Sequence, residues 1–158
     1  MGKVLPLEAL QNQRLSLRNQ KKTVVFTNGC FDILHRGHVD YLEKSKALGD
    51  ILIVGINSDA SMRRIKGSKR PIVNQADRSY IIANLCPVDF VTIFEEDTPF
   101  ELIKGLVPDL LVKGADWKIE NIVGRDIVEG AGGKVATITF TPDHSTSSII
   151  DTIRERFA

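Results

Sequence analysis

Two histidines three residues apart, His35 and His38, are the side chains of this sequence best suited to chemistry. They follow an apolar run over residues 23–26, which predicts a buried strand, and precede residues 39–48, which predict a helix. Such a junction exposes unpaired backbone N–H groups and the positive end of a helix dipole, so it attracts anions. Gly37 leaves room for a ligand to approach. The motif therefore predicts chemistry on a phosphate, with the imidazoles stabilising charge in the transition state.

A metal site is the rival interpretation of these histidines, and a purely structural pair is another. Zinc would need more His, Cys or carboxylate ligands, and the remaining histidine, His144, is far along the chain. The two cysteines, Cys30 and Cys86, fit no common zinc spacing, and we expect both to be reduced and mostly buried. No metal-ligating residues are predicted.

A run of cations over residues 63–70 is the second candidate. An isolated run of this kind is usually a solvated surface loop. Here it follows the apolar run of residues 50–56, so we predict a polar loop that folds as a flap over the outer phosphates of a nucleotide. Lys66 and Lys69 are the expected catalytic contacts. The other cations of the run are Arg63, Arg64 and Arg70.

Hydroxyl side chains cluster near the end of the chain, at Ser145, Thr146, Ser147 and Ser148. One hydroxyl at a helix start serves as an N-cap. Several together at a helix N-terminus also make a cradle for phosphate oxygens, and the two roles are compatible.

The elements that must position these residues alternate between strand and helix from end to end. The expected strands are residues 23–26, 50–56, 88–94, 109–112 and 134–140, and the expected helices are residues 7–19, 39–48, 75–85, 99–106, 122–129 and 148–157. This order predicts an α/β fold, a single Rossmann-like domain whose five-stranded parallel sheet has helices on both faces. Ligands bind such sheets outside the carboxyl ends of the strands. The loops expected to meet there are residues 29–38, 57–70, 113–117 and 141–147.

Composition limits the function classes. The chain has 158 residues and a net charge of +1, which argues against a broad nucleic-acid or membrane surface. No apolar stretch approaches the ~20 residues that span a bilayer, and residues 1–6 lack the apolar core of a signal peptide. We expect a cytoplasmic protein in which an N-terminal helical extension, residues 1–22, precedes one catalytic domain, residues 23–158.

The motif of residues 35–38, with residues 29–32 before it and residues 145–148 near the end, resembles the cytidylyltransferase-like nucleotidyltransferases. The resemblance implies a Rossmann-like fold and attack by a phosphate or carboxylate on the α-phosphate of a nucleoside triphosphate, with release of pyrophosphate. The phrases at residues 26–35, 54–61, 94–99 and 108–114 are similar to the heptose 1-phosphate adenylyltransferases, which make ADP-heptose for lipopolysaccharide.

That narrower resemblance implies ATP, Mg²⁺ carried with it, and a sugar 1-phosphate as reactants. It also implies a stand-alone enzyme with its sugar kinase on a separate polypeptide, and a homodimer as in many members of the superfamily. One departure stands out: related cytidylyltransferases begin their closing Ser/Thr motif with an arginine, whereas residues 140–144 contain none. Cytosine recognition is therefore not carried over.

The hypothetical site places ATP across the carboxyl edge of the sheet, with Phe31 and the backbone at Cys30 against the nucleoside. The expected nucleotide-binding residues are Asn28, Gly29, Cys30, Phe31, Asp32, Gly37, Lys113, Gly114, Ser145, Thr146 and Ser147. The residues expected to face the sugar phosphate or the nucleotide are Asp59, Arg78, Asp116 and Trp117. An exposed loop is the alternative for Asp116 and Trp117, and a surface ion is the alternative for Arg78. We expect Asp32 to orient a histidine or the loop backbone.

Other reactants fit the same motifs, such as glycerol 3-phosphate with CTP or FMN with ATP. A nucleotide-binding module without catalysis is a different class of hypothesis, and His35 and His38 argue against it. A docking subunit for a kinase is a third, with the helix of residues 7–19 as its contact. We favour a helix packed on its own sheet.

Overall fold

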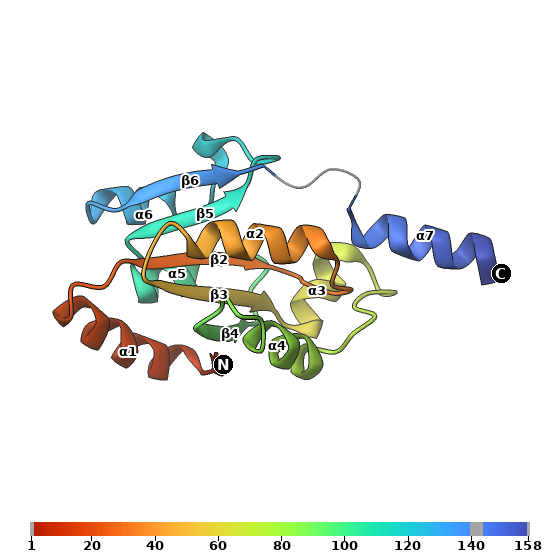
Figure 1. Cartoon of the computed structure of the whole chain (residues 1–158), viewed down its shortest axis with the longest axis horizontal. Helices are drawn as coiled ribbons and strands as arrows, with labels where there is room; N and C mark the ends of the chain where they lie inside the picture. The colour runs from red at the N-terminus through yellow and green to blue at the C-terminus, as the bar shows by residue number, and fades with distance from the viewer. Residues whose placement is uncertain (1, 140–143, 158) are drawn as a thin grey trace.

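A six-stranded parallel sheet forms the centre of the computed structural model, which describes residues 2–139 and 144–157 (Figure 1). The strands are β1 (Lys3–Val4), β2 (Val24–Gly29), β3 (Ile51–Asn57), β4 (Phe90–Phe94), β5 (Leu110–Gly114) and β6 (Lys134–Ile138), in the spatial order β1-β4-β3-β2-β5-β6. The helices are α1 (Leu7–Asn19), α2 (Arg36–Lys46), α3 (Asp59–Lys66), α4 (Gln75–Ala83), α5 (Phe100–Leu106), α6 (Arg125–Gly130) and α7 (Thr146–Phe157), with a 3₁₀ turn η1 (Ile119–Asn121).

Helices cover both faces of the sheet, as predicted. Successive side chains of β2 point to opposite faces, so Phe26 joins the core under α1, α5 and α6, while Val25 joins the core under α2 and α4. Both faces are therefore apolar, and the central strands read as continuous hydrophobic runs. From β2 the chain continues to β3 and β4 on one side of the sheet, whereas β5 and β6 lie on the other side of β2. The direction in which strands are added therefore reverses at β2, and folds of this kind bind ligands at the carboxyl ends of the strands at such a point.

The expected count of five strands was wrong, because β1 adds a sixth at the edge. Lys3 pairs with Phe90 and Val4 with Val91 of β4. Both residues of β1 are exposed and the strand has only two residues, so it carries no alternation that a sequence pattern could reveal. Strand β1 forms because its backbone pairs with that of β4, which is distant in the sequence.

Helix α1 begins and ends where the sequence predicted, and it is bonded to the sheet by a buried arginine. Arg14 is 4% exposed; its Nη2 lies 2.7 Å from Oδ1 of Asp109, and its guanidinium also donates to the carbonyl of Val107. The other carboxylate oxygen of Asp109 accepts from the backbone N–H of Val24 at 2.8 Å. Helix α1 is therefore tied to the amino ends of β2 and β5.

Two expected boundaries were wrong near the predicted site. Residues 57–70 are not a loop throughout, because α3 occupies Asp59–Lys66, with Ser58 as an N-cap that accepts from the N–H of Ser61 at 3.1 Å. Helix α2 begins at Arg36 rather than at residue 39, which makes His35 its N-cap residue.

Within the described residues, every helix is too short or too polar to cross a membrane. Strand β6 ends at Ile138, so Thr139 lies beyond the strand, and residue 140, the last of the expected strand, lies outside the described residues. Residues 141–143 of the expected loop and most of the stretch that departs from the cytidylyltransferases lie outside them too.

Candidate active site

A cavity of about 580 Å³ opens at the carboxyl ends of the central strands. Its walls come from the loop after β2, from α3, from the loops after β4 and β5, and from the start of α7, so residues far apart in the sequence meet there, as predicted. The predicted site residues that line it are Asn28, Gly29, Cys30, Phe31, Asp32, His38, Lys66, Lys113, Trp117, Thr146 and Ser147. Figure 1 shows α3 and α7 at the end to which the strand arrows point.

The two histidines are stacked on each other, with ring centroids 3.8 Å apart and an angle of 21° between the rings. His38 faces the cavity, and His35 lies behind it at the N-cap of α2. A Cβ at Gly37 would lie 3.1 Å from Nδ1 of His35, so glycine allows this close packing. Nδ1 of both rings is buried and has no hydrogen-bond partner among the described residues.

Burial favours the uncharged form of both imidazoles. Together with the nearby His35 it lowers the pKa of His38 to about 4, and together with His144 it lowers the pKa of His35. Two stacked neutral rings do not repel each other, and each carries one N–H to donate. A bound anion would favour their protonated forms.

A second group of predicted residues surrounds the end of β5. Lys113 donates to Oδ1 of Asn28, and its Nζ lies 5.7 Å from the centre of the Trp117 ring. Burial lowers the pKa of Lys113 to about 8. A side pocket of about 140 Å³ adjoins the cavity here and is lined in addition by Gly114 and Asp116. An aromatic face, a cation and a carboxylate thus lie together beside the histidines.

Some cations of residues 63–70 line the cavity and others do not. Lys66, the last residue of α3, lines the cavity, and so does Arg70, whose Nε lies 2.8 Å from Oδ2 of Asp32. Lys69 is exposed and does not line the cavity, so it lies apart from its expected partners. Arg64 does not line the cavity either; its Nε lies 2.6 Å from Oδ1 of Asp97, which does.

The hydroxyl cluster is divided too. Thr146 and Ser147 line the cavity, and Oγ1 of Thr146 donates to the carbonyl of Ile33 at 3.1 Å. Ser145 does not line the cavity; its hydroxyl accepts from the N–H of Ser148 at 3.0 Å, as a cap does. The capping hydroxyl is thus that of Ser145, whereas the side chains that face the cavity are those of Thr146 and Ser147.

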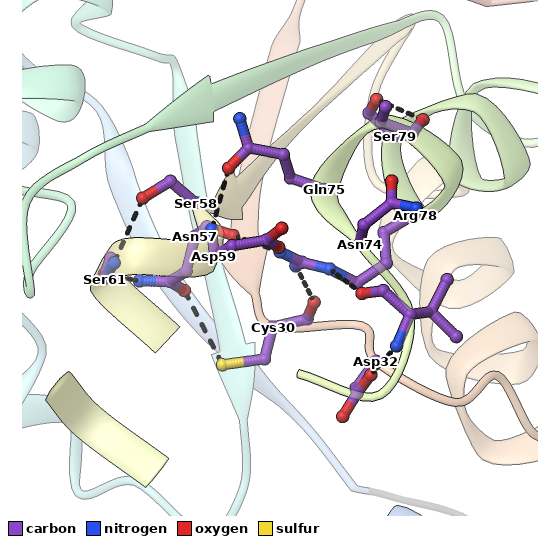
Figure 2. Close-up of polar contacts among 12 residues, drawn as sticks. Cys30, Asp32, Asn57, Ser58, Asp59, Ser61, Asn74, Gln75, Arg78 and Ser79 are labelled. Carbon is purple, nitrogen blue, oxygen red and sulfur yellow. Dashed lines mark hydrogen bonds and ion pairs between the residues drawn. The ribbon is translucent and has the colours of Figure 1, made fainter. Parts of the chain in front are cut away.

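Arg78 and Asp59 do not line the cavity, against expectation, because they are paired with each other at 2.8 Å (Figure 2). The guanidinium of Arg78 is fully buried and also donates to the carbonyls of Cys30, Asn57 and Val73. The surface-ion alternative was wrong as well. Arg78 is a structural contact between the loop after β2 and the end of β3.

Asp32 holds the loop backbone rather than a histidine. Its carboxylate accepts from the N–H groups of Ile72 and Val73 at 2.9 Å each and pairs with Arg70. The thiols differ from the expectation: Cys30 is half-buried on the cavity wall and burial raises its pKa, whereas Cys86 is exposed. Among the described residues, no group of three His, Cys, Asp or Glu side chains is placed to hold a metal ion.

Sequence reasoning missed several lining residues, which come mainly from α3 and from the loop after β4. They are Tyr41 of the side pocket and Asn57, Met62, Ile65, Asp97, Thr98, Pro99 and Val123 of the cavity. The position of residues 97–99 directly after a parallel strand was a signal that could have found them, since such loops share one edge of the sheet.

Comparisons with known proteins agree with this geometry. The family model described as cytidylyltransferase-like matches residues 26–152. A protein of Citrifermentans bemidjiense named Bifunctional protein HldE is 51% identical over 152 residues, which are 96% of this chain and 31% of that protein. The protein of that name from Helicobacter pylori strain Shi470 is 52% identical, with the same shares covered. The chain therefore spans about a third of the length of these relatives.

Solved structures are similar to this chain as well. The lipopolysaccharide core biosynthesis protein from Thermoplasma volcanium is 31% identical, with a TM-score of 0.62 over 76% of this chain and 97% of that one. The pantothenate synthetase from Thermus thermophilus has a TM-score of 0.65 over 98% of this chain and 70% of that one, but at 13% identity it shows the fold alone. By its family model and its relatives, the chain belongs to the cytidylyltransferase-like nucleotidyltransferase family.

Proposed function

We propose that this protein transfers AMP from ATP to D-glycero-β-D-manno-heptose 1-phosphate, giving ADP-heptose and pyrophosphate. The observation that carries the proposal is the stacked pair of His35 and His38 at the N-terminus of α2, in which His38 lines a cavity that also holds Lys66 and Thr146. Membership of the family supports nucleotidyl transfer, and the solved relative named for lipopolysaccharide core biosynthesis supports a sugar substrate.

In the proposed complex the nucleoside lies against Phe31 and Trp117, beside Lys113. The triphosphate then passes His38 toward the N-terminus of α7, where Ser147 offers its hydroxyl and the first turn of the helix offers backbone N–H donors. Lys66 approaches the outer phosphates from the opposite wall. The sugar phosphate occupies the remaining part of the cavity.

The reaction is an in-line displacement at the α-phosphorus. An oxygen of the sugar phosphate forms a bond to that phosphorus while the bond to the bridging oxygen of the β-phosphate breaks and pyrophosphate leaves with that electron pair. The attacking phosphate is already an anion, so no general base is needed. Imidazole N–H groups and the Lys66 ammonium stabilise the charge that develops, and one such donor is worth about 10²–10³ in rate.

We propose that Mg²⁺ enters with ATP, held by phosphate oxygens and water. The two carboxylates that line the cavity, Asp32 and Asp97, are each paired with an arginine, and no cluster of three potential metal ligands occurs among the described residues. When bound, the ion would neutralise phosphate charge, which is chemistry that the lysines also supply.

Pyrophosphate release from ATP and heptose 1-phosphate tests the proposal. Because His38 contacts the reacting phosphates in this scheme, His38→Ala should lower kcat by about 10²–10³ while circular dichroism stays unchanged. Tyr80→Ala, which also truncates a ring but on the exposed side of α4, should retain wild-type turnover.

A panel of reactants separates this function from its rivals. CTP with glycerol 3-phosphate, and ATP with FMN, should release pyrophosphate far more slowly than ATP with the heptose phosphate. Faster turnover with either rival pair, or near-normal turnover in His38→Ala, would contradict the proposal. Tight ATP binding without turnover on any sugar phosphate would indicate a binding module instead.

A further inference from the structure

Arg78 is the largest fully buried side chain among the described residues, and it lies beneath the candidate site. Figure 2 shows its guanidinium between three segments: the loop after β2, the end of β3 and the loop before α4. It donates to the carbonyl of Cys30, to the carbonyl of Asn57 at 2.8 Å and to that of Val73 at 3.0 Å, beside its ion pair with Asp59. Arginine is suited to this because its planar fork presents five N–H donors in fixed directions.

The bond to Cys30 fixes a strained peptide. The next residue, Phe31, has a φ of 47°, in the left-handed region that bulky side chains avoid. A residue keeps such a conformation only where its surroundings impose it. The donor that holds the carbonyl on the N-terminal side of Phe31 is the Nη1 of Arg78.

The strained turn sets the place of the Phe31 ring. The ring is 5% exposed, and its centroid lies 5.2 Å from that of His38 at an angle of 58°. The ring is also close to Gly29, where an added Cβ would lie 3.0 Å from it. The Phe31 ring therefore packs beside the His38 imidazole, which is itself stacked on His35.

We propose that Arg78 is a positioning residue for the transfer reaction: through the carbonyl of Cys30 it holds Phe31 in the left-handed turn that packs the Phe31 ring against His38. Arg78 acts through Phe31 and touches neither reactant. The role in catalysis rests on the function proposed above, whereas the link from Arg78 to His38 rests on the geometry alone.

Arg78→Lys tests the link, because lysine keeps the charge beside Asp59 but cannot reach all four acceptors. The readout is the titration of His38 by NMR without substrates, which is tractable in a chain with three histidines. Loss of the Phe31 ring hydrates the imidazole, so the pKa of His38 should rise from about 4 toward the ordinary 6.5. In turnover, kcat should fall by about 10²-fold, with a smaller change in the KM for ATP.

Ser79→Ala is the matched control. Ser79 is the next residue of α4 and is also buried, and its hydroxyl donates to the carbonyl of Ala76 at 2.9 Å. It should leave the titration of His38 and kcat unchanged. A general loosening of α4 would instead move both readouts in both variants, and that result would overturn the proposal.

Phe31→Asn supplies the second test, since asparagine tolerates the left-handed region without a clamp. It should raise the pKa of His38 as Arg78→Lys does, and adding Arg78→Lys to it should change the titration and kcat no further. If Arg78→Lys alone does not fold, Phe31→Asn by itself still tests the link through the titration of His38. Independent losses that multiply, or an unchanged titration in folded Arg78→Lys or in Phe31→Asn, would overturn the proposal. A correct titration with no turnover in the wild-type protein would refute the proposed function and leave the link intact.

Discussion

At the scale of the single residue, the neutral state of His38 couples the site to stability. Burial lowers its pKa to about 4 in the folded protein, while the unfolded chain has a value near 6.5. Between these values the unfolded state binds more protons, so the free energy of unfolding should fall as pH decreases from about 6.5 toward 4. The slope from this one group is at most about 1.4 kcal/mol per pH unit. Urea denaturation at a series of pH values measures it.

His38→Asn removes this titration and should flatten the slope between pH 6.5 and 5, above the range in which most carboxylates titrate. His35 stays in that variant, and its own lowered pKa acts in the same direction, so part of the slope should remain. Equal slopes in the variant and the wild-type protein would show that His38 is not held neutral by the fold.

The sequence could predict those residues whose role follows from their spacing to near neighbours in the chain. His35, Gly37 and His38 are defined by spacing at one junction, and the structure stacks the two rings there. Arg78 could not be predicted in the same way, because its acceptors are backbone carbonyls at residues 30, 57 and 73. No side-chain pattern marks a carbonyl that will need a donor, so a buried arginine looks like a surface ion in the sequence.

At the scale of the element, α3 decides which lysine serves the cavity. Its last residue is Lys66, which lines the cavity, whereas Lys69 follows the end of the helix and does not line it. Lys66→Ala should therefore lower kcat/KM by about 10²-fold, since it removes a cation near the leaving group. Lys69→Ala is the matched control and should lose much less activity in the same pyrophosphate assay. Equal losses would indicate that the segment closes over the nucleotide as a unit, as the sequence alone suggested.

The sequence predicted most of the helices and strands, but α3 was wrongly predicted to be part of a loop. Asn57, Ser58 and the following charges resemble a polar loop, yet Ser58 is an N-cap, and Met62 and Ile65 recur at helical spacing. The five cations of residues 63–70 favoured the prediction of a polar loop over that of a helix. Strand β1 was missed for a different reason: two exposed residues gain their structure only from β4.

At the scale of the whole molecule, residues 3–19 share the core of the rest of the chain. Strand β1 extends the sheet, Leu10 of α1 is fully buried, and Arg14 joins α1 to Asp109. Arg14→Met should cost about 2–4 kcal/mol of unfolding free energy, because a buried donor to a carboxylate and a carbonyl is lost. The KM for ATP should stay unchanged, since these contacts lie at the amino ends of the strands. Denaturant unfolding and steady-state kinetics measure the two quantities.

The control for Arg14 is another arginine ion pair of this chain that is not buried. Arg125 and Glu129 pair at 2.9 Å along α6, with exposed fractions of 39% and 43%. Water screens such a pair, so Arg125→Met should cost no more than about 0.5 kcal/mol. A large difference between the two variants shows that the N-terminal segment is part of one cooperative unit, because only a joined segment transmits the loss to global unfolding. Equal small costs, or an early separate transition in Arg14→Met, would mean instead that α1 unfolds by itself and that the sheet stands without it.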